Sequence, residues 1–439
     1  MTTQDHDTRP DQMKAGAVAE PCAPGKPRRA QRLLSFFIGH GVDRSFVPLL
    51  VVTLLSTTAF AALWSYLGIW SVTRLHASTG EVGVVYAINA LAAATAGYLG
   101  GRLSDRLGRR FVICLGWGGE AAAALALALV GSRSYLGFAL IVVAGAASGP
   151  GMAATNAVVA DLVPEDQQES AYATLRVVSN IGYAAGPPLA ALSIIGGHWS
   201  RLFVGTSLMG FAAAIVAAGF LKVPASARNP HPRNDPAERS THAIVHDRPF
   251  LLLLLSTLLA FIVYVAYENV LPIATVKYLG LATTTWGLLA IVNPVVVTLF
   301  QVRVTRLVQR FPATRRLAGS LLLMGLPFLL LILNSSTAMI VVVVGVFAVG
   351  EMVWVPTSQA LAASLAPPRE RGAYMGAFGA SSSVAWAIGP LIALNLLGAS
   401  GPALTWVFFA GMGVAAGVTG AAAALLAASR QPVAPRKDS

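Results

Sequence analysis

The stretch 101-GRLSDRLGRRFVI-113 lies between two long apolar segments and places one acidic side chain among four arginines. Three glycines allow one helix to stop and the chain to turn tightly, because glycine adopts left-handed backbone angles at little cost: Gly100, Gly101 and Gly108. Asp105 is the single acidic residue of this stretch. A carboxylate in such a turn can accept hydrogen bonds from a helix N-terminus. Three basic side chains are expected to hold the turn on the cytoplasmic face of a membrane: Arg106, Arg109 and Arg110.

The composition is that of a membrane protein. The 439 residues are 55% hydrophobic and 11% charged, whereas soluble proteins carry roughly a quarter charged residues. The charges cluster and leave runs of about 20 apolar residues, the length of a membrane-spanning helix. We predict twelve such runs, at about 47–72, 81–101, 110–131, 135–160, 171–195, 201–222, 249–273, 284–303, 315–334, 337–363, 372–398 and 402–428.

The formal net charge of +12 would suit a nucleic-acid partner, but the placement of the basic residues argues against one. With both termini in the cytoplasm, 27 of the 31 Lys and Arg residues fall on the cytoplasmic side or at its boundary. The four exceptions are Arg74, Arg133, Arg201 and Lys277. This distribution follows the positive-inside rule, so the basic charge predicts the orientation of the chain in a bilayer.

The polar segments divide the chain. The longest internal polar segment separates the first six predicted spans from the last six. The N-terminal tail is Pro-rich and predicted to be disordered. We expect a short interfacial helix before the first span. The predicted organisation is a cytoplasmic tail at 1–32, a six-helix bundle at 33–221, a cytoplasmic linker at 222–248, a second six-helix bundle at 249–428 and a cytoplasmic tail at 429–439.

Three motifs repeat in the second half at nearly the same offset. Residues 157–164 match 360–367 at an offset of 203, and Gly186-Pro187 matches Gly389-Pro390 at the same offset. Residues 102–107 match 306–311 at an offset of 204. The repeat predicts two homologous bundles related by an axis along the membrane normal, with a substrate bound between them.

The stretch 101–113, the twelve spans and the repeat resemble the major facilitator superfamily of transporters. The resemblance covers about residues 45–430 and implies an all-α membrane fold of two pseudo-symmetric six-helix bundles. It also implies a conformational latch in the 101–113 turn, built from Gly101, Asp105, Arg106, Gly108, Arg109 and Arg110. The second copy of this turn carries Gln309 in place of Asp105, so an acidic latch is expected in the first half.

Residues 182–191, GYAAGPPLAA, resemble a motif of proton-coupled antiporters, with alanines in place of its last two glycines. Gly182 and Gly186 are four apart and permit close helix packing, while Pro187 removes a backbone hydrogen bond and bends the helix. The alternative is ordinary packing of small residues. Upstream, Arg176 is predicted to form a structural ion pair with Asp161 or Glu169, or to reach the membrane interface.

Three acids fall within apolar spans, where ionisable residues are costly and are functional candidates by default. Glu351, Glu268 and Glu120 are therefore the candidates for proton coupling. A neutral structural role is the alternative for Glu351 and for Glu120, and Glu268 lies far enough along its span to reach water instead. No Lys or Arg occurs in residues 138–160, where members of this family often carry a basic residue.

Aromatic and polar residues near these acids are the candidates for binding substrate. An aromatic side chain beside an acid suits an organic cation, through cation–π attraction and charge. Trp354 and Ser358 share a helical face with Glu351. The full set is Trp354, Ser358, Tyr264, Tyr267, Trp64 and Asn180.

The sequence thus predicts a secondary transporter of the inner membrane that resembles the twelve-helix drug:proton antiporters. It would export small apolar or cationic compounds by alternating access, with protons as the coupling ion, and act as a monomer. No ATP-binding loop or catalytic motif occurs, so neither an enzyme nor a cofactor is expected. The alternatives are an exporter or importer of one metabolite and, more remotely, a non-transporting sensor or a membrane enzyme.

Overall fold

The computed structural model describes residues 44–130, 134–163, 168–223, 244–367 and 370–430. All regular elements within these ranges are helices. The tail predicted at 1–32, the expected interfacial helix and most of the linker predicted at 222–248 lie outside the described residues.

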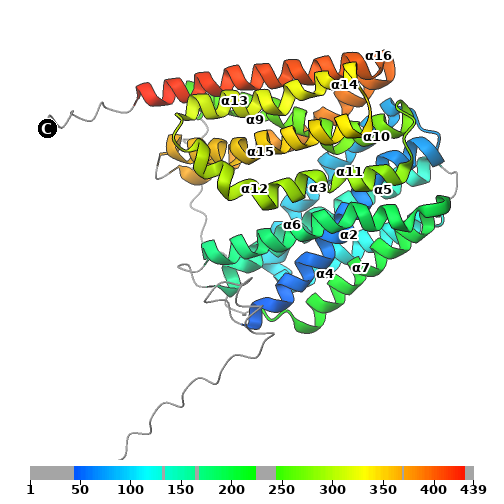
Figure 1. The fold of residues 1–439 in the computed structure, drawn as a ribbon. Coiled ribbons are helices and arrows are strands. Elements are labelled where there is room, and N and C mark those ends of the chain that lie inside the picture. The colour runs from blue at the N-terminus through cyan, green and yellow to red at the C-terminus, as the bar shows by residue number, and fades with distance from the viewer. Residues whose placement is uncertain (1–43, 131–133, 164–167, 224–243, 368–369, 431–439) are drawn as a thin grey trace, which may run out of the picture. The chain divides into compact units, whose positions relative to one another are not determined.

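The helices of the first half follow one another with short connections (Figure 1). They are η1 (Arg44–Phe46), α2 (Val47–Arg74), α3 (Thr79–Leu107), α4 (Arg109–Leu127), α5 (Ser134–Leu162), α6 (Gln168–Ser193), η3 (Ile195–Gly197) and α7 (Trp199–Phe220).

The second half contains more breaks within its spans. Its elements are α9 (Arg248–Val265), the π-helical turn η5 (Ala266–Val270), α10 (Leu271–Lys277), α11 (Thr283–Ala290), α12 (Val292–Val308), α13 (Ala313–Gly325), η6 (Leu326–Leu329), α14 (Leu330–Leu333), α15 (Thr337–Leu365) and α16 (Arg371–Ser429).

The described residues contain twelve segments of membrane-spanning length, as the sequence predicts. Ten helices are long and apolar enough to cross a membrane. One of them, α16, is two helices joined at Gly401, where the backbone is not helical and φ is 75°. The twelfth is α6, whose 26 residues include more polar side chains and so fall outside the ten.

The contacts among these helices are mostly between elements of the same half. Helix α2 packs against α6 and α7, and α5 packs against α3 and α4. In the second half α16 packs against α9 and α13, while α15 packs against α12 and α13. The main pairs that join the two halves are α3 with α16, α6 with α11, α6 with α12, and α2 with α10 and η5.

Small residues stand at the closest of these contacts. A Cβ at Gly186 would lie 2.7 Å from the Ala61 Cβ, and one at Gly325 would lie 2.7 Å from the Gly413 Cα. Lipid tails are as apolar as leucine, so helices in a bilayer gain stability from van der Waals packing of close backbones. The backbone approach that glycine permits is therefore a main source of cohesion here.

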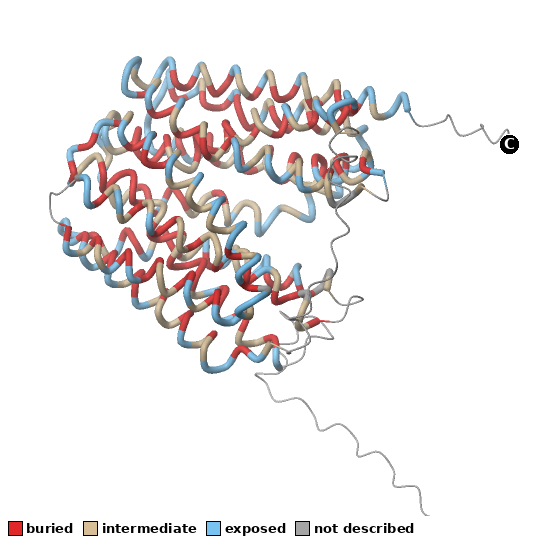
Figure 2. Tube along the Cα trace, turned by 180° about the vertical axis from the view of Figure 1, so that it is seen from behind, coloured by how far each residue is buried: buried red, intermediate tan, exposed pale blue. Residues whose placement is uncertain are grey.

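Large apolar side chains remain exposed along the outer helix faces. Figure 2 shows buried and exposed residues alternating along most helices, and Ile215 on α7 and Leu288 on α11 are each 68% exposed. On a soluble protein such exposure would be costly, whereas hydrocarbon solvates these side chains. The pattern is that of helices that face lipid on one side and each other on the opposite side.

The turn between α3 and α4 forms around Gly108, not around Gly100 or Gly101. Gly108 has φ of 96° and its N–H donates to the Ser104 carbonyl, which ends α3 before α4 begins. Gly100 and Gly101 lie inside α3 with ordinary helical angles. The expectation that they also form the turn is wrong, since Gly100 instead allows α3 to approach Pro150 of α5.

Candidate substrate and proton site

Glu351 lies in the middle of α15 and is bound by a neighbouring helix. The side-chain amide of Asn293, near the start of α12, donates a hydrogen bond of 2.8 Å to the Glu351 carboxylate. Asn293 is buried and Glu351 is half-buried. Sequence reasoning missed Asn293, because a single asparagine at the break between α11 and α12 gave no motif.

Glu268 occupies the π-helical turn η5, a local widening of the seventh span. The N–H of Leu271 donates to the carbonyl of Ala266, five residues earlier. Pro272 follows directly and lacks the N–H that a regular α-helix would use. Turns of this type are frequent at functional sites, and this one places Glu268 so that its charge interacts with that of Glu351.

Tyrosines surround these two acids. Tyr264 and Tyr267 both interact electrostatically with Glu268 and Glu351. The Tyr267 ring stacks on Phe347 of α15 at a centroid distance of 5.3 Å, and its hydroxyl donates to the Ala290 carbonyl. The structure therefore brings together five predicted or newly found side chains, which we name the central polar group: Glu268, Glu351, Asn293, Tyr264 and Tyr267.

Trp354 and Ser358 belong to the packing around this group. Trp354 is 2% exposed, and its ring meets Phe261 of α9 edge-on at 5.0 Å. The Ser358 hydroxyl is buried and donates to the Val355 carbonyl of its own helix. Their role in binding substrate stays a prediction.

Helix α6 faces the central polar group from the first half. Arg176 and Tyr183 are two turns apart and so share one helix face. Arg176 interacts electrostatically with Glu351, and Tyr183 with Glu268. Asn180 is half-buried between them on the same face. Arg176 is thus a basic residue on the fifth span, whereas the fourth span, residues 138–160, contains no Lys or Arg.

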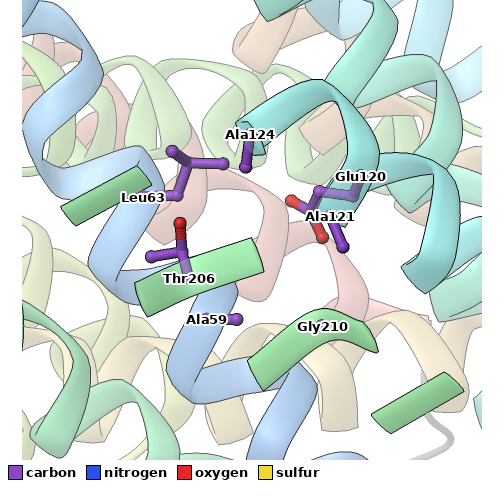
Figure 3. Close-up of a pocket in the computed structure, with 7 residues that line it drawn as sticks. All are labelled: Ala59, Leu63, Glu120, Ala121, Ala124, Thr206 and Gly210. Atoms are coloured by element: carbon purple, nitrogen blue, oxygen red, sulfur yellow. The ribbon is translucent and has the colours of Figure 1, made fainter. Parts of the chain in front are cut away.

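Glu120 is separate from this group and is paired with Trp64. The indole Nε1 of Trp64 on α2 donates a hydrogen bond of 3.0 Å to Glu120 Oε1 on α4. Glu120 is 5% exposed and lines a small cavity between α2, α4 and α7 (Figure 3). The structure therefore assigns Trp64 a polar partner that its position in the sequence did not reveal.

Of the residues of the predicted latch, Arg109 connects helix ends, and the side chain of Asp105 lies outside the described part of the chain. Arg109 Nη1 donates to the Ser104 hydroxyl, and Arg109 Nε pairs with Asp161 Oδ2 of α5 at 3.0 Å. Arg106 and Arg110 are exposed. The predicted ion pair between Arg176 and Asp161 is not formed: Arg109 pairs with that carboxylate, and Arg176 interacts electrostatically with Glu351. The side chain of Glu169, the other predicted partner, lies outside the described part of the chain.

The second copy of the turn lacks this ion pair. The repeat places Ser364 at the position of Asp161 and Ala313 at the position of Arg109. The two halves therefore differ at both positions of the Arg109–Asp161 ion pair, as well as at the position of Asp105.

The glycines of the α6 motif serve helix packing. Side chains at Gly182 or Gly186 would collide with Thr57, Thr58 and Ala61 of α2. Pro187 lies inside α6 and its carbonyl approaches Gly287 of α11, in the second half. The packing interpretation of the motif therefore describes what these glycines do locally.

The fold and its buried acids define a polytopic helical membrane protein with ionisable groups inside its spans. The chain belongs to the Major Facilitator Superfamily, whose family model matches residues 49–318 and 257–439. It is a multi-pass membrane transporter and not an enzyme. The predicted all-α major facilitator fold is confirmed.

Comparisons with individual proteins place the chain among transporters. A Na(+), Li(+), K(+)/H(+) antiporter of Planococcus maritimus is 24% identical over 382 residues, which are 80% of this chain and 88% of that protein. The multidrug resistance protein MdtH of Klebsiella pneumoniae is 25% identical over 332 residues, 75% of this chain and 80% of that protein. The crystal structure of the nucleoside transporter NupG matches with a TM-score of 0.73 at 15% identity, covering 87% of this chain and 99% of that one. At that identity the similarity concerns the fold alone.

Proposed function

We propose that this transporter exports small apolar or cationic compounds in exchange for protons. The observation that carries the proposal is the central polar group, in which Glu268 and Glu351 interact inside the spans. Two carboxylates that repel each other bind a single proton or cation more strongly than either would alone, because the positive charge removes their repulsion. A cationic substrate and a proton would therefore compete for this group, which is the requirement for exchange.

The aromatic side chains support an organic cation as one of the two competitors. Tyr264 contacts Phe347 and Trp386, with ring centroids 5.8 Å and 6.2 Å away. Aromatic faces attract organic cations by cation–π interaction. The relative named as a multidrug resistance protein agrees with this substrate class.

A second candidate is exchange of monovalent metal cations for protons. The relative from Planococcus maritimus, named as a Na(+), Li(+), K(+)/H(+) antiporter, favours it, and the same two carboxylates would serve as ligands. For either candidate we propose a monomer in the inner membrane with both termini in the cytoplasm, supported by the positive-inside distribution of Lys and Arg.

The test uses purified protein in liposomes with an imposed pH gradient. Lumenal pH is followed while tetraphenylphosphonium, a neutral drug, Na+ or K+ is added to wild type, Glu351→Gln and Glu268→Gln. We expect tetraphenylphosphonium to drive proton movement in wild type and both single variants to lose most of it, because each removes one exchangeable proton.

Glu81→Gln is the matched control, since Glu81 is an exposed acid at the start of α3 whose capping role glutamine preserves. Proton movement with Na+ or K+ alone would favour the second candidate. If none of the tested compounds drives proton movement, both candidate functions are contradicted. Full activity in both Glu351→Gln and Glu268→Gln would show that the central polar group takes no part in proton coupling.

A further inference from the structure

Glu120 faces a cavity that lies apart from the central polar group. The cavity lies between three helices of the first half, with Leu63 from α2, Ala124 from α4 and Thr206 from α7 in its wall. It has room for about one water molecule. In Figure 3 Glu120 lies across the cavity from Leu63 and Thr206, and one of its carboxyl oxygens points toward them.

One oxygen of Glu120 is occupied and the other faces this space. Oε1 accepts the hydrogen bond from the Trp64 indole. No described residue donates a hydrogen bond to Oε2. An isolated charge is expensive in an interior of low dielectric, so a proton arriving at Oε2 would remove that cost without breaking the bond to Trp64.

The remaining polar group in the wall is an acceptor. The Thr206 hydroxyl hydrogen points to the Leu202 and Phe203 carbonyls, at 3.0 Å and 3.1 Å, and leaves its oxygen lone pairs for another donor. Thr206 and Glu120 Oε2 therefore both require a donor, which one water can satisfy by bonding to both. The rest of the wall is Ala, Leu and Gly, which offers too few oxygens for a metal ion.

Trp64 connects this site to the rest of the molecule. Its ring lies 5.6 Å from Phe60, and Phe60 lies 6.4 Å from Tyr183 of α6. Tyr183 interacts electrostatically with both Glu120 and Glu268. Within the described residues, Trp64 and Tyr183 are the electrostatic neighbours of Glu120, and α5 and α7 contribute no charged group to its surroundings.

We propose that Glu120 is a second proton-binding site. A water held against Thr206 relays a solvent proton to Oε2, accepting one proton as it passes one on, and the hydrogen bond to Trp64 reports the occupancy of the site. The site belongs to the first half and is distinct from the Glu268–Glu351 pair. It extends the proton-coupled function proposed above, but its first test requires no transport.

The test follows tryptophan fluorescence of the full chain in nanodiscs during a pH titration. An indole that donates to a carboxylate emits differently from one that donates to a neutral acid, so proton binding changes the Trp64 emission. We expect a pH-dependent component in wild type that Trp64→Phe and Glu120→Gln both abolish. Trp117→Phe is the matched control, since Trp117 is a buried indole on α4 that donates to the neutral Thr155 hydroxyl.

Thr206→Val provides a variant that keeps the carboxyl group. It removes the second acceptor for the water. We therefore expect the pH-dependent fluorescence of Trp64 to persist, with the midpoint of its pH titration shifted. The proposal is overturned if the pH-dependent fluorescence survives in Glu120→Gln. It is also overturned if Glu351→Gln abolishes that fluorescence and Glu120→Gln does not.

The two proposals fail separately. A titrating Trp64 signal with no drug-driven proton movement would retain the Glu120 site and reject the antiport function. Drug-driven movement in a protein without the Trp64 signal would retain antiport and reject the site.

Discussion

Arg109 joins the ends of three helices through one side chain. It begins α4, donates to Ser104 of α3 and pairs with Asp161 of α5. Both charged side chains of the pair are largely buried, at 17% and 15% exposure. An ion pair that is shielded from solvent and fixed by a further hydrogen bond contributes more than a surface pair, whose typical value is below about 1 kcal/mol.

At the residue scale we predict that Arg109 and Asp161 are energetically coupled. A double-mutant cycle of Arg109→Ala and Asp161→Ala, read from thermal unfolding in detergent, should give a coupling free energy of about 1 kcal/mol. The cycle of Arg176→Ala with Asp161→Ala should give a value near zero, because Arg176 does not contact that carboxylate. A larger coupling in the second cycle would contradict the assignment.

Helix α6 is held against α2 at Gly186 by backbone approach. A Cβ there would lie 2.7 Å from the Ala62 nitrogen and 2.9 Å from the Thr58 oxygen, both backbone atoms that cannot move independently. Gly205 on α7 offers the opposite environment, with no atom within 4 Å of an added Cβ. The two glycines differ in packing and share the same helical conformation.

At the element scale we predict that a glycine-to-alanine substitution changes the free energy of unfolding differently at these two positions. Gly186→Ala should lower the free energy of unfolding by roughly 1–3 kcal/mol, as overpacking does. Gly205→Ala should leave it unchanged or raise it by up to about 1 kcal/mol, because alanine favours the helix. Melting temperatures of the two purified variants check this, and a stabilised Gly186→Ala variant would show that α6 does not pack as described.

The two halves touch closely where the start of α3 meets α16. A Cβ at Gly83 would lie 2.9 Å from the Pro390 carbonyl oxygen, and one at Gly80 would lie 2.7 Å from Asn395 Oδ1. These contacts exist only while this end of the molecule is closed. Transport by alternating access requires the same contacts to separate in another state.

At the scale of the whole molecule we predict that Gly83→Leu shifts the population toward opening at this end. The readout is the labelling rate of a cysteine at Asn395 by a membrane-impermeant thiol reagent, with Cys22 and Cys114 replaced by serine. Labelling should accelerate in Gly83→Leu and stay unchanged in Gly205→Leu. Equal rates in both, with melting temperatures preserved, would mean that the contact does not control closure.

The sequence by itself determined the number of spans, the turn at Gly108 and the superfamily fold. These depend on local properties: the length of apolar runs that a bilayer requires, the backbone freedom of one glycine and the distribution of arginines. They can be seen without knowing which helix neighbours which.

Only the tertiary structure decided the partners of the buried charges. Asp161 with Arg109, Glu351 with Asn293, and Glu120 with Trp64 are 52, 58 and 56 residues apart. Each pair depends on the rotation of two helices about their axes, which small residues set through packing at sites far along the chain. The apolar composition of a span is nearly the same for every rotation, so periodicity could place Glu351 at mid-span but could not assign its neighbour. In this molecule hydrophobic length therefore determined the fold, and helix packing determined the site.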